Sequence, residues 1–162
     1  MRPLLGATCA SLVLLLPAPP AHAVPDGDLR AYLDHLAPLA LGWPADGTVT
    51  DGFGPRWGRM HLGIDVGILR SLDVTAAAAG TVTEVGWLPG YGGYGNVVVV
   101  DVGDGYSVLY AHLASADVQH GQWVAAGTRV GTAGCTGSCT GTHLHFELRR
   151  DGLPVDPAPY LR

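Results

Sequence analysis

The stretch NVVVVDVGDGYSVLYAHL, residues 96–113, holds two runs of β-branched and aromatic residues separated by one short turn. Both runs have the composition of β-strands. The tripeptide Gly103-Asp104-Gly105 between them is typical of a tight hairpin turn. The stretch therefore predicts two adjacent antiparallel strands, the second of which carries His112 close to its end.

Short apolar runs and glycines continue on both sides of this hairpin. TVTEVGW (81–87) precedes it, and VQHGQWVAAGTRVGTAG (118–134) follows it with brief apolar steps separated by glycines. Glycine supplies 24 of the 162 residues, which suits many short strands joined by tight turns. We therefore predict a mainly β domain of sandwich or barrel type over residues 45–162, because no low-complexity linker divides this region.

The N-terminal 44 residues have a different character. Residues 1–23 combine an early arginine, an apolar run and the sequence Ala21-His22-Ala23, which is typical of a secretory signal and its cleavage site. The apolar run is shorter than the roughly 20 residues of a membrane-spanning helix. We expect no stable membrane insertion and a secreted or cell-envelope location. Residues 24–44 read as a lead-in, with a short helix over 28–37 where apolar residues recur at helical spacing.

The overall charge limits the classes of partner. The chain has a formal net charge of −5 with histidine neutral, and it contains no lysine. A protein that binds nucleic acid through its phosphates needs clustered cationic side chains. We therefore expect no nucleic-acid partner.

Two histidines lie one residue apart in GTHLHFELRR (141–150), a segment that otherwise reads as an apolar strand. Side chains two residues apart share a face of a strand, so His143, His145 and Glu147 lie on one face and the apolar residues on the other. The apolar face can pack in a core. The polar face is either an accident of surface composition or the floor of a site.

A second cluster is HLGID (61–65). In an extended strand, His61 and Asp65 would be about 13 Å apart, too far to bind one metal ion. They can converge if the chain bends at Leu62-Gly63, which glycine permits. A helix would also bring them together, but the glycines at 63 and 67 weaken that interpretation.

Three segments together supply the side chains of a metal site, namely His61, Asp65, His112, His143 and His145. A catalytic zinc ion needs three protein ligands and a fourth position open to water. This set provides three ligands and leaves two imidazoles for proton transfer. Strand geometry does not decide which of His143 and His145 would bind the metal.

The motifs HLGID, LYAHL and THLHFE, in this order, resemble those of the lysostaphin-type (LytM-like) zinc metallopeptidases, which cut bacterial cell walls. Flanking segments such as DGFGPRW (51–57) and VDPAPYL (155–161) resemble the same family, so the likeness runs roughly from residue 47 to residue 161. The resemblance implies an antiparallel β sandwich or barrel-sandwich hybrid of the duplicated hybrid motif type.

The resemblance also implies residue roles. It makes His61, Asp65 and His145 the ligands of one zinc ion, and His112 and His143 the catalytic pair. Glu147, on the same face, is not a ligand in the family, and we expect it to support the site from behind.

The implied function is a secreted, monomeric zinc metalloendopeptidase that hydrolyses peptide bonds in peptidoglycan cross-bridges or stem peptides, with a regulatory protein as a candidate partner. The alternative is a non-catalytic LytM-like protein that binds the wall or activates another hydrolase. Such relatives typically lack zinc-binding or catalytic residues, and all five are present here. The spacing of apolar residues and glycines at 118–127 also resembles lipoyl- or biotin-carrier domains. These domains carry their cofactor on a lysine, and the chain has none.

Cys135 and Cys139 are the only cysteines after residue 23. In an oxidising compartment, two cysteines around a glycine turn predict a disulfide, with thiolate metal ligands as the alternative. We expect the disulfide to stiffen a wall of the cleft. The loop GYGGYGN (90–96) lacks the features of a phosphate loop and either presents Tyr91 and Tyr94 to a ligand groove or is a plain connection.

Overall fold

Twelve strands and one short 3₁₀ helix form the regular structure of residues 39–162, the part of the chain that the computed structural model describes. The strands are β1 (Thr48–Asp51), β2 (Gly54–Arg56), β3 (Arg59–His61), β4 (Ile64–Gly67), β5 (Asp73–Thr75), β6 (Gly80–Gly86), β7 (Asn96–Gly103), β8 (Tyr106–Ala116), β9 (Trp123–Val124), β10 (Arg129–Ala133), β11 (Leu144–Arg150) and β12 (Leu153–Val155), and the helix is Ala158–Tyr160. The expected signal segment and the helix over 28–37 lie outside the described residues.

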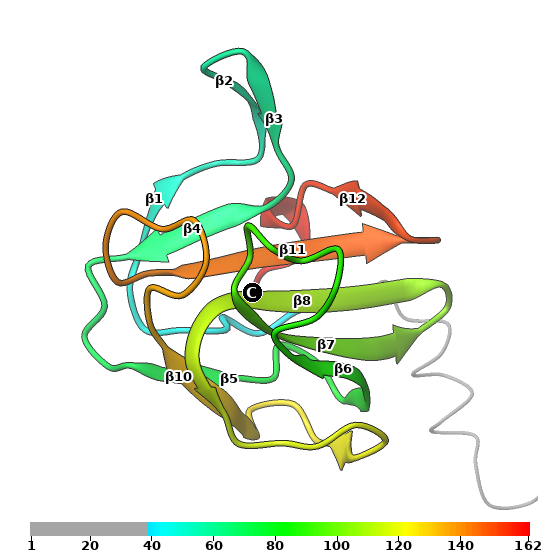
Figure 1. Cartoon of the computed structure of the whole chain (residues 1–162). Coiled ribbons are helices and arrows are strands. Elements are labelled where there is room, and N and C mark those ends of the chain that lie inside the picture. The colour runs from blue at the N-terminus through cyan, green and yellow to red at the C-terminus, as the bar shows by residue number, and fades with distance from the viewer. Residues whose placement is uncertain (1–38) are drawn as a thin grey trace, which may run out of the picture. The chain divides into compact units, whose positions relative to one another are not determined.

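Most strands belong to one antiparallel sheet with the order β1-β4-β11-β8-β7-β6-β9 (Figure 1). β12 extends it beside β11, while β10 pairs with β5 and with the last residues of β8. β2 and β3 form a separate hairpin that projects from the sheet next to β1 and β4 (Figure 1). The predicted mainly β fold of antiparallel strands is confirmed.

The hairpin of β7 and β8 forms where the sequence predicts it. Gly103, Asp104 and Gly105 all have positive φ angles, of 87°, 53° and 76°. Glycine adopts this region freely and aspartate tolerates it better than most residues, so these three residues allow the chain to reverse at once. β8 therefore lies beside β7 and, on its other edge, beside β11.

The central strand β11 alternates between two buried faces. Leu144, Phe146 and Leu148 are fully buried in the main hydrophobic core, as the sequence pattern predicts. His145 and Glu147 point the opposite way and are also buried, with exposed fractions of 6% and 0%. A buried charged residue requires partners, so this second face is the floor of a polar site and not an ordinary surface.

Candidate metal centre

Two neighbouring strands place Asp65 and His145 together. β4 and β11 are antiparallel neighbours, and Asp65 lies directly opposite His145 in their register. His61 ends β3 and reaches the same point because the chain turns at Leu62-Gly63 before β4 begins. The predicted bend is therefore present, and it brings the side chains of His61 and Asp65 into contact.

Only glycine fits at residue 63, because the bend leaves no space for a Cβ atom there. A Cβ atom on residue 63 would lie 2.2 Å from the carbonyl oxygen of Phe146 and 2.9 Å from Cγ of Glu147. Real Cβ atoms do not approach other atoms so closely. The glycine thus lets the His61–Asp65 segment pack directly on β11.

Three ligand atoms converge at this place. His61 Nε2 lies 3.1 Å from Asp65 Oδ1 and 3.0 Å from His145 Nδ1, and the last two atoms are 2.9 Å apart. Bonds of about 2.0–2.1 Å to a tetrahedral zinc ion put two ligand atoms about 3.3 Å from each other. The three atoms therefore need to separate by only a few tenths of an ångström to surround such an ion.

Hydrogen bonds behind the two imidazoles fix which nitrogen faces the centre. His61 donates from Nδ1 to the carbonyl of Gly52 at 2.6 Å, and His145 donates from Nε2 to Oε1 of Glu147 at 3.0 Å. In the neutral rings, the lone pairs of His61 Nε2 and His145 Nδ1 then point at the Asp65 carboxylate. Three mutually facing acceptors require a cation between them. This donor set, of two imidazole nitrogens and one carboxylate oxygen, fits zinc.

The electrostatics agree with a cation site. Burial alone would raise the pKa of Asp65, but the hydrogen bond and charge of His145, with the charges of His61 and His143, outweigh it and hold the pKa far below its ordinary value. Burial also opposes a charge on His145, yet hydrogen bonds to Asp65 and Glu147 raise its pKa overall. The ionised Asp65 and a positive charge at this position therefore stabilise each other.

Glu147 supports the centre from below. It accepts a hydrogen bond from the Tyr94 hydroxyl at 2.6 Å and one from Nε of Arg149 at 2.8 Å, in addition to that from His145. Burial would raise its pKa, but the bonds from His145 and Tyr94 and the charge of Arg149 lower it overall. The ionised carboxylate thus holds His145 in the tautomer and orientation that the centre needs.

His112 and His143 lie next to the centre as a pair. Their ring centroids are 4.7 Å apart. His112 donates from Nδ1 to the carbonyl of Thr136 at 2.8 Å, and His143 donates from Nδ1 to that of Gly141 at 2.7 Å. Both neutral rings therefore keep Nε2 unprotonated, and burial lowers the pKa of His112 below its ordinary value. His143 Nε2 lies 3.7 Å from Asp65 Oδ1.

The backbone of His112 is unusual. Its φ is +60°, in the left-handed region that few residues other than glycine occupy. The pairing of β8 with β11 ends at Ala111, and beyond His112 the strand pairs at Leu113 with both β7 and β10, with a register shift in each of these two ladders. The irregularity turns the His112 side chain toward the site, as bulges next to active sites often do.

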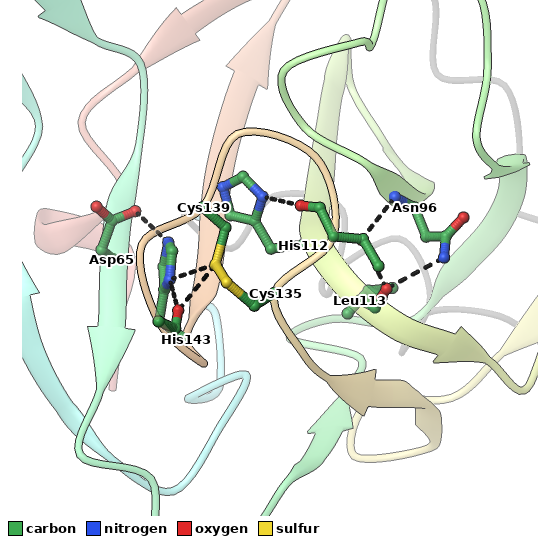
Figure 2. Close-up of a disulfide and its surroundings, with 9 residues drawn as sticks. Asp65, Asn96, His112, Leu113, Cys135, Cys139 and His143 are labelled. Carbon is green, nitrogen blue, oxygen red and sulfur yellow. Dashed lines mark hydrogen bonds and ion pairs between the residues drawn. A yellow bond between two sulfur atoms is a disulfide. The ribbon is translucent and has the colours of Figure 1, made fainter.

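All five predicted residues line one cleft of about 940 Å³. Its walls are the β2–β3 hairpin, with Trp57 and Met60, and the segment 138–143. Tyr94 also lines the cleft, so the loop 90–96 does present a tyrosine to a groove, while Tyr91 packs beside Tyr94 and against Arg149. Cys135 and Cys139 form the expected disulfide, and Cys139 contributes to the cleft wall (Figure 2).

Sequence reasoning missed two contributors. Arg56 donates from Nη1 to Oδ2 of Asp65 at 3.1 Å and also pairs with Asp51, so it holds the carboxylate oxygen that faces away from the two imidazoles. Thr136 supplies the carbonyl that orients His112. Neither residue carries a signal in the sequence, because one acts through a contact nine residues away and the other through its backbone.

Residues 59–157 match the sequence pattern described as peptidase family M23. The chain belongs to this family. The match spans every residue of the centre and both histidines beside it.

Two relatives of the chain are named for different activities. The chain is 38% identical over 126 residues to the "Murein hydrolase activator NlpD" of Salmonella dublin, which covers 77% of this chain and 32% of that protein. It is 41% identical over 99 residues to the "DD-carboxypeptidase/endopeptidase Mpg" of Neisseria meningitidis, which covers 61% of this chain and 22% of that protein. The chain thus spans a third or less of the length of these relatives.

Solved structures of two peptidases are similar to the described fold. The catalytic domain of the antimicrobial peptidase lysostaphin from Staphylococcus simulans has a TM-score of 0.63 and 33% identity, over 70% of this chain and 91% of that one. A zinc-containing peptidase from Vibrio cholerae has a TM-score of 0.64 and 33% identity, over 72% of this chain and 39% of that one. Across residues 39–162, no helix has the length and apolarity needed to cross a membrane.

Proposed function

We propose that this M23 chain is a zinc metalloendopeptidase that hydrolyses peptide bonds in bacterial peptidoglycan. His61, Asp65 and His145 would hold one zinc ion, and His112 and His143 would be the catalytic pair. The observation that carries the proposal is that one cleft holds both a candidate metal site and a pair of histidines beside it. Three lone pairs converge on a cation position, and two further imidazoles lie beside it with unprotonated Nε2 atoms.

When bound, a zinc ion would supply Lewis-acid chemistry, because it lowers the pKa of a bound water toward about 7 and polarises a carbonyl. The protein's own groups handle the protons and the developing charge. His112, buried and kept neutral, accepts the proton of the attacking water at Nε2. His143 is the more exposed of the pair, so its Nε2 can take a proton from bulk solvent, and that Nε2–H would then hydrogen-bond the oxyanion that develops on the peptide carbonyl.

The remaining cleft residues bind the peptide. Trp57, Met60 and Ile68 are exposed apolar side chains with exposed fractions of 83%, 47% and 76%, and all three line the cleft. An extended peptide laid along the cleft would cover them. The stem peptides and cross-bridges of peptidoglycan lie in the cell envelope, so we propose an extracytoplasmic location. We also propose that the enzyme acts as a monomer.

The test is digestion of purified peptidoglycans that differ in bridge type. Zinc-loaded protein, chelator-treated protein and a His143→Ala variant are incubated with each, and released fragments are identified by mass. We expect fragments from the zinc-loaded protein with at least one peptidoglycan, none after chelation, and recovery when zinc is returned. A zinc-loaded protein that releases no fragment from any of them would refute the proposal.

The second candidate is a regulator that activates another wall hydrolase, and the likeness to a protein named as a murein hydrolase activator favours it. The two functions separate cleanly in one assay. If the chain only activates, the wild type and His143→Ala will stimulate an added hydrolase equally and release nothing alone. If it is an enzyme, His143→Ala will lose the release that the wild type shows without any partner.

A further inference from the structure

The loop between β10 and β11 is closed twice. At its base, the backbone N–H of His143 donates to the carbonyl of Gly134 at 3.2 Å, in an isolated antiparallel bridge. Inside it, the Cys135–Cys139 disulfide joins two residues whose Cα atoms are 5.3 Å apart. The loop therefore cannot spread without breaking a covalent bond. We call residues 135–139 the disulfide loop.

Thr136, within the disulfide loop, is hydrogen-bonded to β7 and to β8 next to His112. Its hydroxyl donates to the carbonyl of Leu113 at 2.8 Å and accepts from the backbone N–H of Asn96 at 3.0 Å. Its carbonyl accepts from Nδ1 of His112 at 2.8 Å. One residue thus ties the disulfide loop, β7 and β8 together at the histidine.

The disulfide loop also fits closely against the glycines of the loop 90–96. The backbone N–H of Ser138 donates to the carbonyl of Gly93 at 2.9 Å. A Cβ atom on Gly95 would lie 2.4 Å from Thr136, and one on Gly137 would lie 2.4 Å from the nitrogen of Gly95. Both glycines have positive φ, of 68° and 74°. The two loops therefore interlock with no room for side chains between them.

These contacts hold the strained backbone of His112 from both sides. Its N–H donates to the carbonyl of Tyr94, in the interlocked loop, at 2.8 Å. Its ring is held by Thr136 in the disulfide loop. A positive φ at a residue other than glycine persists only when its surroundings fix it, and here the two loops do so.

The disulfide loop also contacts His143. The Nδ1 atom of His143 lies 3.8 Å from Sγ of Cys139 and donates to the carbonyl of Gly141, two residues beyond the disulfide. Figure 2 shows the disulfide close to His143. Both rings of the pair are therefore oriented from one short segment, whereas the three converging ligand atoms take no hydrogen bond from it.

We propose that the disulfide loop is a positioning element for the two histidines, with Thr136 as the positioning residue that fixes the Nδ1–H tautomer of His112. This inference rests on the proposed function for its kinetic consequence, but the tautomer it assigns is a property of the protein alone. The loop acts on the pair and leaves the metal centre unaffected.

The first test compares Thr136→Val with Thr136→Ser in zinc-loaded protein. Valine has the shape of threonine but lacks the hydroxyl that fastens the disulfide loop to Leu113 and Asn96, whereas serine keeps it. A misplaced catalytic group lowers turnover by about 10- to 100-fold. We expect Thr136→Val to lower kcat on a soluble peptidoglycan fragment by at least about tenfold, with KM and zinc stoichiometry unchanged, and Thr136→Ser to stay within about twofold of the wild type.

The second test removes the covalent closure with the double variant Cys135→Ala, Cys139→Ala. We expect the same pattern of a lowered kcat, full zinc content and unchanged KM. A loss of zinc in parallel with kcat would overturn the proposal, because the loop would then support the metal centre. An unchanged kcat in both Thr136→Val and the double variant would overturn it as well, as would equal losses in Thr136→Val and Thr136→Ser.

A third measurement needs no turnover. Nitrogen-15 correlation spectra of the imidazole rings report which nitrogen of His112 carries the proton in zinc-loaded protein. We expect a single Nδ1–H tautomer in the wild type and in Thr136→Ser, and a mixture of tautomers in Thr136→Val. The same tautomer in all three refutes the positioning role. Should the wild type cleave no peptidoglycan, the proposed function fails, and this spectrum still decides on Thr136.

Discussion

Asp65 and His145 face each other across neighbouring strands, with Oδ1 and Nδ1 2.9 Å apart. Since the strands are antiparallel and in register, the backbone hydrogen bonds of the sheet place these two side chains next to each other. A metal centre built on paired strands is more rigid than one built on loops. The centre is therefore pre-formed, and zinc binding should need little rearrangement.

His143, directly before β11, and His145, within β11, should have different roles. We expect His145→Ala to lose both zinc and turnover, because it removes a ligand. His143→Ala should retain one zinc per chain and lose at least about 100-fold in turnover. Elemental analysis of both variants, with fragment release measured beside it, checks this. Equal zinc contents in the two variants would contradict the assignment.

Replacing Glu147 by Gln should weaken zinc binding without removing a ligand. The change keeps the shape of the side chain but removes its negative charge. In the wild type, that charge holds His145 and balances the charge of the Arg149 guanidinium. Loss of a carboxylate behind a metal-bound histidine typically costs about 10- to 100-fold in affinity. Competition with a chromophoric chelator measures the loss.

Tyr94→Phe is the matched control for that variant. It removes one hydrogen bond to Glu147 but leaves the carboxylate and its bond to His145 in place. We expect its zinc affinity to stay much closer to that of the wild type. A Glu147→Gln variant that binds zinc as tightly as Tyr94→Phe would contradict the supporting role of the carboxylate.

Gly63→Ala should destabilise the whole domain. Its new Cβ would clash with the backbone of Phe146, which cannot move without shifting β11. Overpacking of this kind costs about 1–3 kcal/mol. Gly92→Ala is the control, because nothing lies within 4 Å of a Cβ at that position. Denaturant unfolding of the two variants should show a lower midpoint for Gly63→Ala alone.

The pH dependence of turnover should have its acid limb below pH 6.5. Burial lowers the pKa of His112 from 6.5, so the neutral form that accepts a proton persists as the pH falls to that value. Turnover is then lost only as the pH passes through the lower pKa of the folded protein. Zinc content is measured at each pH, because protonation of the ligands also releases metal. An acid limb centred at or above pH 6.5 with zinc retained would contradict this.

Sequence reasoning found what depends on alternation and on turn residues. The two faces of β11 follow from a period of two, and the bend at Leu62-Gly63 follows from the need to bring His61 to Asp65. The division of His143 and His145 between pair and metal came from the family resemblance, and it stays a proposal. A strand pattern places both side chains on one face and says nothing about which ring reaches farther.

The contacts that hold the site from behind could not be read from the sequence. Arg56 meets Asp65 only because the β2–β3 hairpin folds beside β4, and Thr136 meets His112 only because two glycine loops interlock. These are products of tertiary packing between segments with no shared periodicity. The left-handed backbone of His112 has the same origin.

That left-handed residue has a thermodynamic consequence. Holding a side chain larger than hydrogen at such a φ costs about 1–3 kcal/mol, a sizeable share of the net stability of a domain of this size. Selection for heat resistance alone would favour glycine at residue 112. Under the proposed function, the imidazole at this position gives up stability in exchange for reactivity.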